Sequence, residues 1–224
     1  ILGLVMTETN ITLSGFKNRS DLHIARKIWH VSGVFTMFTA WLFLPQWLSM
    51  TMLIVGWAVF VPMDIIRQKN PDFNRTLSNI FRPIMRSSEL NRLAGTTYLL
   101  SGTLVITLLF NNGVVALSLL FLAFADPIAS YVGIKYGKDK IFGHKSVQGF
   151  IAAFIVCSVL CFLFLYYNQV QEHLLVVSLF AGLIGALAEL IPLGKLDDNF
   201  SMPVLSSLGL SLLFYFFNFF PFFK

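Results

Sequence analysis

Charged residues are scarce in this chain, at 12% of its 224 residues, whereas 56% are hydrophobic. About a quarter of the residues in a soluble domain are charged, so this composition excludes an ordinary soluble domain and indicates a polytopic membrane protein. Cysteine is also rare. Cys157 and Cys161 lie in an apolar run without neighbouring His or Cys for a zinc site, so we expect both to be buried apolar side chains. No sustained alternation of polar and apolar residues occurs, which favours helices over a β-barrel.

Seven apolar segments are long enough to span a bilayer core of ~30 Å, which takes roughly 20 helical residues. They cover residues 30–46, 47–66, 93–110, 113–134, 147–167, 173–193 and 203–223. The predicted fold is therefore an all-α, polytopic membrane helical bundle of about seven transmembrane helices. It forms one domain over residues 1–224, with an amino-terminal arm over 1–25 and a further segment over 67–92 between the second and third spans.

The basic residues are confined to one side of this predicted bundle. Every Lys and Arg except Lys224 lies in the amino-terminal arm, directly after it at Arg26 and Lys27, in the segment 67–92, in the loop 135–145 or at Lys195. The positive-inside rule places that side, and the amino terminus, in the cytoplasm. The net charge of +5 is then a consequence of topology, and we expect the bilayer rather than nucleic acid as a partner.

The segment over residues 73–92 has apolar residues at helical spacing, with its arginines elsewhere around the helix. This pattern predicts an interfacial amphipathic helix on the cytoplasmic leaflet, kinked at Pro83. A solvated linker whose arginines set topology is the alternative. Glu89, followed by Gly95-Thr96-Thr97-Tyr98, is a candidate wall for a groove that binds a lipid substrate.

The first group of candidate site residues precedes the first span. Arg26, Lys27 and His30 fall on one face of a helix, because residues three and four apart are neighbours there. Together they would hold phosphate or supply a base. An interfacial basic anchor with one polar histidine is the alternative.

The second group begins at Asp126 and Pro127. This pair suits an N-cap followed by proline at the first helical position, so the fourth span is predicted to break and restart there. Broken transmembrane helices expose backbone groups at ligand sites. Asp126, Ser130, Gly133 and Gly137 then form a narrow stripe of small and polar residues, against which another helix or a nucleotide would pack.

A glycine- and lysine-rich loop follows, containing Lys138, Lys140, Gly143, Lys145, Ser146 and Gly149. The order G-x-x-x-x-G-K-[ST] is absent, so the loop is no Walker A motif. A loop that ends before a helix can still place amides and a lysine on phosphate. A basic loop that sets topology, after a packing stripe of glycines, is the alternative.

The third group lies in ELIPLGKLDDNFSMP, residues 189–203, and contains Glu189, Asp197, Asp198 and Asn199. Magnesium prefers hard oxygen ligands and often takes one or two carboxylates plus substrate phosphates. Asp126 together with Asp197 or Asp198 would provide them. A capped, water-exposed acidic turn is the alternative.

Three stretches together resemble the CTP-dependent lipid kinases, a family of dolichol and polyprenol kinases, phytol and farnesol kinases and CTP-dependent diacylglycerol kinases. The stretches are RKIWH (26–30), DPIASYVGIKYGKDKIFGHKSVQG (126–149) and ELIPLGKLDDNFSMP (189–203). The central one is also similar to phosphatidate cytidylyltransferases. The resemblance implies transfer of the γ-phosphate of CTP to the hydroxyl of a membrane lipid alcohol, with Mg²⁺ as the divalent metal. The alternatives are a cytidylyltransferase that makes a CDP-lipid and a small multi-pass transporter.

The resemblance places Asp126, Lys140, Lys145, Ser146 and Gly149 in the nucleotide-binding stretch and Glu189, Asp197, Asp198 and Asn199 in the acidic motif. Our hypothesis is that Asp126 and Asp198 bind magnesium and that Asp197, Glu189 or His30 accepts the hydroxyl proton. The family often has a carboxylate four positions before the arginine of RKIWH, where this chain has Leu22 beside Asp21. The predicted nucleotide-binding residues are Arg26, Lys27, Ser130, Gly133, Gly137, Lys138, Lys140, Gly143, Lys145, Ser146, Gly149 and Asn199.

Overall fold

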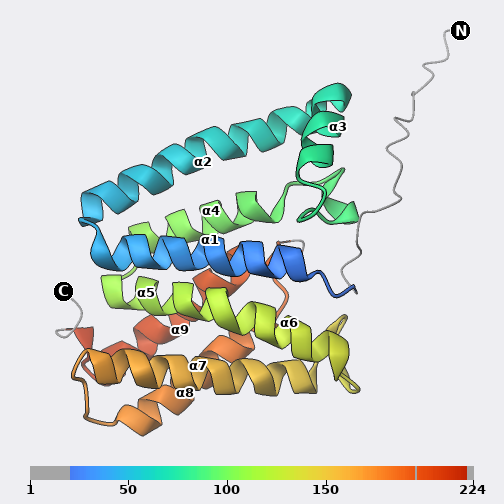
Figure 1. Ribbon diagram of the computed structural model, residues 1–224. Helices are drawn as coiled ribbons and strands as arrows, with labels where there is room; N and C mark the ends of the chain where they lie inside the picture. Colours follow the sequence, from blue (N-terminus) through green and yellow to red (C-terminus); the bar gives the residue numbers. More distant parts are fainter. Residues whose placement is uncertain (1–20, 195, 221–224) are drawn as a thin grey trace, which may run out of the picture.

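In the computed structural model, which describes residues 21–194 and 196–220, the chain folds into a bundle of helices (Figure 1). The helices are α1 (Ile24–Phe43), α2 (Gln46–Lys69), α3 (Pro71–Ile80), α4 (Gly95–Leu109), α5 (Asn112–Leu120), α6 (Asp126–Lys135), α7 (Val147–Tyr167), α8 (Leu174–Leu190) and α9 (Asp198–Phe216). Two short strands, β1 (Lys140–Phe142) and β2 (Lys145–Ser146), form a hairpin between α6 and α7. The predicted all-α bundle is confirmed. Lys195, the arm over residues 1–20 and the end of the last predicted span lie outside the described residues.

Within the part of the chain that the structure describes, four helical segments are long and apolar enough to cross a membrane: Gln46–Lys69, Asn112–Lys135, Val147–Tyr167 and Asp198–Phe216. Helices α4 and α8 are apolar but shorter. Large apolar side chains such as Leu109, Tyr167 and Phe216 are exposed, as a lipid-facing surface requires. The structure therefore has the character of a membrane bundle, while the number of seven spans stays a prediction.

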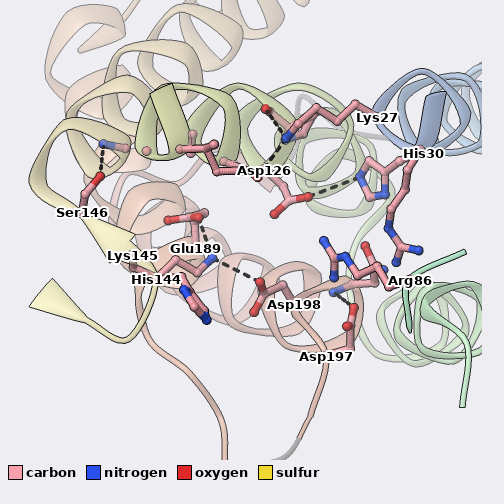
Figure 2. Close-up of a pocket in the computed structure, with 18 residues that line it drawn as sticks. Lys27, His30, Arg86, Asp126, His144, Lys145, Ser146, Glu189, Asp197 and Asp198 are labelled. Carbon is pink, nitrogen blue, oxygen red and sulfur yellow. Dashed lines mark hydrogen bonds and ion pairs between the residues drawn. The ribbon is translucent and has the colours of Figure 1, made fainter. Parts of the chain in front are cut away.

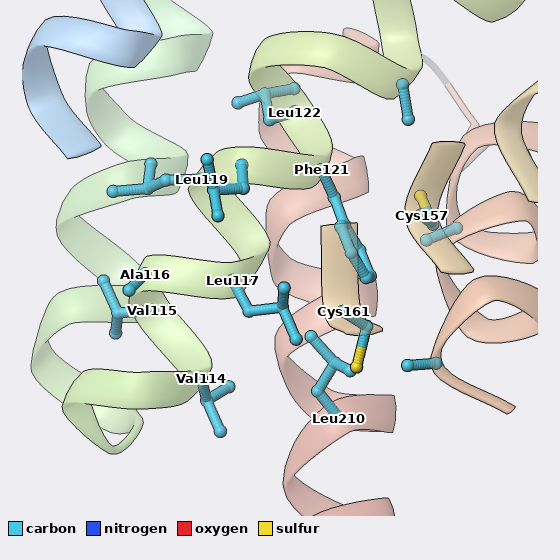
Figure 3. Close-up of a cluster of buried hydrophobic side chains, with 14 of the residues drawn as sticks. Val114, Val115, Ala116, Leu117, Leu119, Phe121, Leu122, Cys157, Cys161 and Leu210 are labelled. Atoms are coloured by element: carbon cyan, nitrogen blue, oxygen red, sulfur yellow. The ribbon is translucent and has the colours of Figure 1, made fainter. Parts of the chain in front are cut away.

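Helix α5 forms the centre of the core, because every residue from Gly113 to Leu120 is buried (Figure 3). Its one buried hydroxyl, on Ser118, lies 2.8 Å from the hydroxyl of Ser207 on α9. Buried polar groups need such partners. Cys157 and Cys161 on α7 are buried and free, as predicted.

The interruption predicted at Asp126 has a different form. Residues Phe121–Ala125 wind as one π-helical turn between α5 and α6, and Ala125 keeps helical angles (φ −70°, ψ −43°). The predicted break with Asp126 as N-cap is therefore wrong. Pro127 lacks an N–H and its ring would clash with a carbonyl in a regular α-helix. The wider π-turn accommodates the proline without leaving the helical path.

Helix α3 also differs from its prediction, since it ends at Ile80 and does not continue through Pro83. Proline disfavours the helical conformation in the residue before it, so the kinked helix was wrong. The buried residues of α3 are the polar Asn74 and Ser78. Asn74 accepts a hydrogen bond from Arg67 Nη1 at 2.7 Å and donates one to the carbonyl of Leu90 at 2.9 Å. The polar face of α3 thus binds it to the bundle.

The start of α1, helix α3 and the β-hairpin lie at one end of the bundle, and the turns between α1 and α2, α4 and α5, and α7 and α8 lie at the other (Figure 1). The three groups of candidate residues therefore meet at one end. That this end faces the cytoplasm stays a prediction.

Candidate active site

A polar cavity of about 90 Å³ lies at this end of the bundle (Figure 2). Elements far apart in the sequence form it: α1, the segment before Ser87, α6, the hairpin, α7, the end of α8 and the start of α9 with Asp197 before it. Its lining residues are Arg26, Lys27, His30, Arg86, Asp126, Pro127, Ala129, Ser130, Gly133, Ile134, His144, Lys145, Ser146, Gly149, Glu189, Asp197, Asp198 and Asn199. All five candidates for catalysis are among them.

Lys145 lies between two of the carboxylates of this cavity. Its Nζ is 2.5 Å from Glu189 Oε1 and 3.2 Å from Asp198 Oδ2. Burial by itself would lower the pKa of Lys145, but the negative charges of Asp198 and Glu189 outweigh it and hold the pKa above the usual lysine value. Lys145 is therefore a fixed positive charge in the wall of the cavity.

His30 joins α1 to the π-turn. Its Nε2 lies 2.9 Å from the carbonyl oxygen of Leu122 and 3.8 Å from Asp126 Oδ2. In a π-helical turn the carbonyl of Leu122 would bond the N–H of residue 127, which proline lacks, so it is available to His30. A carbonyl only accepts hydrogen bonds, so Nε2 carries the proton. This fixes His30 beside Asp126 with its nearer nitrogen as a donor.

Lys27 makes a second connection between α1 and α6. Its Nζ donates to Ser130 Oγ at 2.8 Å and to the carbonyl of Pro127 at 3.2 Å. The predicted neighbours on the α1 face, Lys27 and His30, therefore position this helix against the one that carries Asp126. Figure 2 shows both side chains pointing toward α6.

The predicted stripe of small residues packs helix against helix. A Cβ at Gly137 would collide with the carbonyl of Gly133 and the side chain of Ser146, and one at Gly149 would lie 3.0 Å from the carbonyl of Ala129. Ser146 caps α7 by accepting the Gly149 N–H at 3.2 Å. The glycines therefore let α6 and α7 approach closely, which is one of the two uses predicted for them.

Four of the predicted nucleotide-binding residues lie outside the cavity lining: Gly137, Lys138, Lys140 and Gly143. The side chain of Lys138 is exposed, and Lys140 Nζ lies 3.3 Å from the carbonyl of Gly133. Gly143 occupies the hairpin turn with φ of +53°, a conformation that favours glycine. Contacts between these residues and a nucleotide stay a prediction.

Two ionisable lining residues were not among the predicted site residues. Arg86 was assigned to the amphipathic segment, and no role was given to His144. No local pattern distinguishes Arg86 from the other arginines of residues 67–92. Only the path of the chain after α3 brings it to the cavity.

Asp64 was also missed, although an acid within an apolar run is a recognised sign of function. Its carboxylate accepts hydrogen bonds from Arg67 Nε at 2.6 Å, the N–H of Ala94 at 2.9 Å and Thr97 Oγ1 at 2.5 Å. Arg67 in turn donates to the carbonyls of Glu89 and Arg92. This buried network holds the start of α4 against α2.

A second cavity of about 240 Å³ adjoins the first and is mostly apolar. Glu89, Gly95 and Thr96 of the predicted groove wall line it, whereas Thr97 and Tyr98 do not. Arg26, His30 and Asn199 line both cavities. The full lining is Arg26, Trp29, His30, Gly33, Met37, Phe60, Met63, Asp64, Arg67, Leu77, Phe81, Ile84, Met85, Glu89, Ala94, Gly95, Thr96, Leu99 and Asn199.

The polar cavity has the oxygen donors that magnesium prefers. Among the described residues no group of three or more His, Cys, Asp or Glu side chains converges into a closed metal site. Magnesium commonly uses only one or two carboxylates and takes its remaining ligands from phosphates and water. Four basic side chains, Arg26, Lys27, Arg86 and Lys145, face four acidic ones, Asp126, Glu189, Asp197 and Asp198. The positive and negative side chains of the wall balance, so the wall carries no net positive charge to neutralise a polyphosphate. The donor set therefore fits a cation that binds together with the polyphosphate.

Comparison with known proteins identifies a family and several relatives of this chain. Residues 1–192 match the model of the cytidylyltransferase family. CTP-dependent diacylglycerol kinase 1 of Saccharomyces cerevisiae is 31% identical over 206 residues, which cover 83% of this chain and 71% of that protein. The protein of the same name in Schizosaccharomyces pombe is 34% identical over 170 residues, covering 69% and 77%, and that of Eremothecium gossypii is 32% identical over 176 residues, covering 70% and 56%. No solved structure matches the chain.

Proposed function

The chain belongs to the cytidylyltransferase family and, within it, to the CTP-dependent lipid kinases, and from that membership we propose that it transfers the γ-phosphate of CTP to the hydroxyl of a membrane lipid. The observation that carries the proposal is a polar cavity that shares Arg26, His30 and Asn199 with an apolar one. A water-soluble phosphate donor and a lipid acceptor must meet at such a boundary. The polar residues gather at one end of the bundle, which favours an enzyme over a transporter.

Phosphoryl transfer depends on positioning and on neutralising charge, with little covalent chemistry for the protein to do. In this proposal Lys145 and Arg86 bind the phosphates of CTP. Lys145 is held in place by Glu189 and Asp198, so its charge needs no reorganisation when the nucleotide enters. Lys27 and His30 position Asp126 by joining α1 to α6.

Asp126 and Asp198 would hold magnesium, whose chemistry is to neutralise the β- and γ-phosphate oxygens as charge moves onto the leaving group. Both line the cavity and both offer carboxylate oxygens. Because the basic and acidic side chains of the wall balance, the metal would supply the positive charge that the phosphates need.

Of the three candidate bases, Asp197 has the most suitable surroundings. Glu189 is engaged by Lys145, and the nearer nitrogen of His30 is a donor. The Asp197 carboxylate accepts the backbone N–H of Asn199 at 3.1 Å, and burial raises its pKa above the usual aspartate value. A raised pKa makes a carboxylate a better base near neutral pH. The lipid oxygen bonds to the γ-phosphorus, the bond from that phosphorus to the β–γ bridging oxygen breaks, CDP leaves, and the proton passes to Asp197.

For the acceptor we propose diacylglycerol first, because the three similar fungal proteins are named diacylglycerol kinases. Isoprenoid alcohols such as polyprenol, dolichol, phytol and farnesol are the second candidate class. All of these present a hydroxyl at the membrane interface beside a hydrocarbon chain.

The test is purified protein in detergent with γ-labelled CTP or ATP and a panel of diacylglycerol and isoprenoid alcohols. Labelled phospholipid and CDP are expected from CTP. Transfer from ATP alone would overturn the choice of nucleotide. Formation of a CDP-lipid from a lipid phosphate, with release of labelled pyrophosphate, would establish the cytidylyltransferase reaction instead, which the family name and the central motif favour as the second candidate.

A further inference from the structure

The apolar cavity is bounded by one face of α1. Arg26, Trp29, His30, Gly33 and Met37 line it, and their spacing places them along a single helical stripe. The stripe extends for about 16 Å, at 1.5 Å of rise per residue. It begins at the residues shared with the polar cavity and ends among apolar side chains.

Helix α2 bounds the cavity from the opposite side with Phe60 and Met63. The two helices are joined at Pro45 and diverge toward the end that carries α3 (Figure 1). Trp29 lines the cavity and is also 55% exposed, so the cavity reaches the outer surface of the bundle there. Tryptophan is favoured where a protein surface meets the membrane interface.

Gly33 lines the apolar cavity, and tight packing does not explain it. The helical glycines Gly95, Gly182 and Gly185 sit where a Cβ would collide with a neighbouring group, so tight packing explains them. Gly56 on α2 has open space around it as Gly33 does, but Gly56 does not line the cavity. A Cβ at Gly33 would have no described atom within 4 Å. Glycine inside a helix costs stability relative to alanine, and here no neighbour requires it. Its effect is to leave space in the cavity.

We propose that this cavity is the acceptor site, which holds the hydrocarbon chain of the lipid alcohol between α1 and α2. The hydroxyl lies at the boundary formed by Arg26, His30 and Asn199, next to the bound nucleotide. Gly33 provides room for the chain. This inference rests on the proposed function, which supplies the lipid and the reaction.

Gly33→Leu tests the proposal by filling this space, since a Cβ at this position would meet no described atom within 4 Å. We expect kcat/KM for long-chain diacylglycerol to fall at least tenfold, with KM for CTP within twofold of wild type. Ser32→Leu is the matched control, because Ser32 is adjacent, exposed and lines neither cavity. It should match the wild-type protein for both substrates. Equal effects of the two variants, or none from Gly33→Leu, would overturn the assignment.

Photolabelling separates this inference from the proposed function. A diacylglycerol with a photoreactive acyl chain, applied without CTP, should label peptides that contain Trp29 to Met37 or Phe60 to Met63. Gly33→Leu should reduce that labelling severalfold. If the wild-type protein phosphorylates lipid but is labelled elsewhere, the groove is wrong and the kinase stands. If it phosphorylates no lipid yet is labelled here in a Gly33-dependent way, the groove stands and the proposed reaction is wrong.

Discussion

Arg26 and Glu89 form a two-bond ion pair, in which Nη1 and Nη2 of the arginine each lie 2.8 Å from an oxygen of the carboxylate. Glu89 also accepts the backbone N–H groups of Arg86 and Gly95, each at 2.9 Å. One carboxylate therefore joins the start of α1, the segment before Ser87 and the start of α4. Glu89 therefore fixes Arg26 in the wall that the two cavities share.

Glu89→Gln should change how stability depends on pH. Burial would raise the pKa of Glu89, but the hydrogen bond and the charge of Arg26 outweigh it and hold the pKa below the usual glutamate value of 4.5. A depressed folded pKa contributes stability that is present above the unfolded pKa and is lost as the pH falls through the folded one. Above that window the variant should be about 1–3 kcal/mol less stable. Below pH 4.5 the melting temperature of the wild-type protein in detergent should fall more steeply than that of the variant. Parallel curves would contradict this.

Lys145→Met should lower kcat/KM for CTP by at least ~100-fold, because one preorganised charge at a reacting phosphate has about that effect. Lys69→Met, an exposed lysine at the end of α2, is the control and should leave the rate near that of wild type. Lys138→Met should cost less than Lys145→Met, since its exposed side chain lines neither cavity. A larger loss for Lys138→Met would mean that the hairpin moves onto the nucleotide.

Asp126→Asn should reduce turnover by ~100-fold or more while the protein remains folded, since the substitution removes a charge and keeps the shape of a proposed magnesium ligand. The measurement is labelled lipid formed from γ-labelled CTP, with the melting temperature recorded for the same preparation. Asp72→Asn on the exposed first turn of α3 is the matched control. Near-normal turnover by Asp126→Asn would exclude the metal role.

Asp197→Asn tests the proposed base, and asparagine caps a helix about as well as aspartate, so α9 should still form. In the wild-type protein kcat/KM for the lipid should rise with pH as Asp197 loses its proton. Because burial raises its pKa, that rise should lie above the usual aspartate range. The residual activity of the variant should not show this rise with pH. If the variant shows the same rise, the titrating group is not Asp197.

Gly137→Ala should destabilise the protein by about 1–3 kcal/mol, the usual cost of overpacking a tight contact. A Cβ there would collide with the Gly133 carbonyl and with Ser146. Gly56→Ala in α2 is the control, because its Cβ would meet no described atom within 4 Å. It should be neutral or stabilising by up to about 1 kcal/mol. Thermal unfolding in detergent compares the two variants, and equal melting temperatures would contradict the packing argument.

Much of the site could be anticipated from sequence, since its acids, Lys145 and the pair Lys27 and His30 all stand in recognisable local patterns. The form of the chain at Asp126 could not, because a proline inside a helix allows either a break or a π-turn. Which one occurs depends on His30 and α1 being present to satisfy the carbonyl of Leu122. The sequence likewise did not predict that α3 ends at Ile80 or that Arg86 lines the cavity.

The sequence by itself determined that this is a helical membrane protein with a polar site at one end, because hydrophobicity and basic-residue bias act over short stretches of chain. Only the tertiary structure decided which charges meet. Arg26 and Glu89 are 63 positions apart, and Lys145 and Glu189 are 44 apart. In a medium of low dielectric each buried charge requires its own partner, and only the packing of the helices brings those partners together.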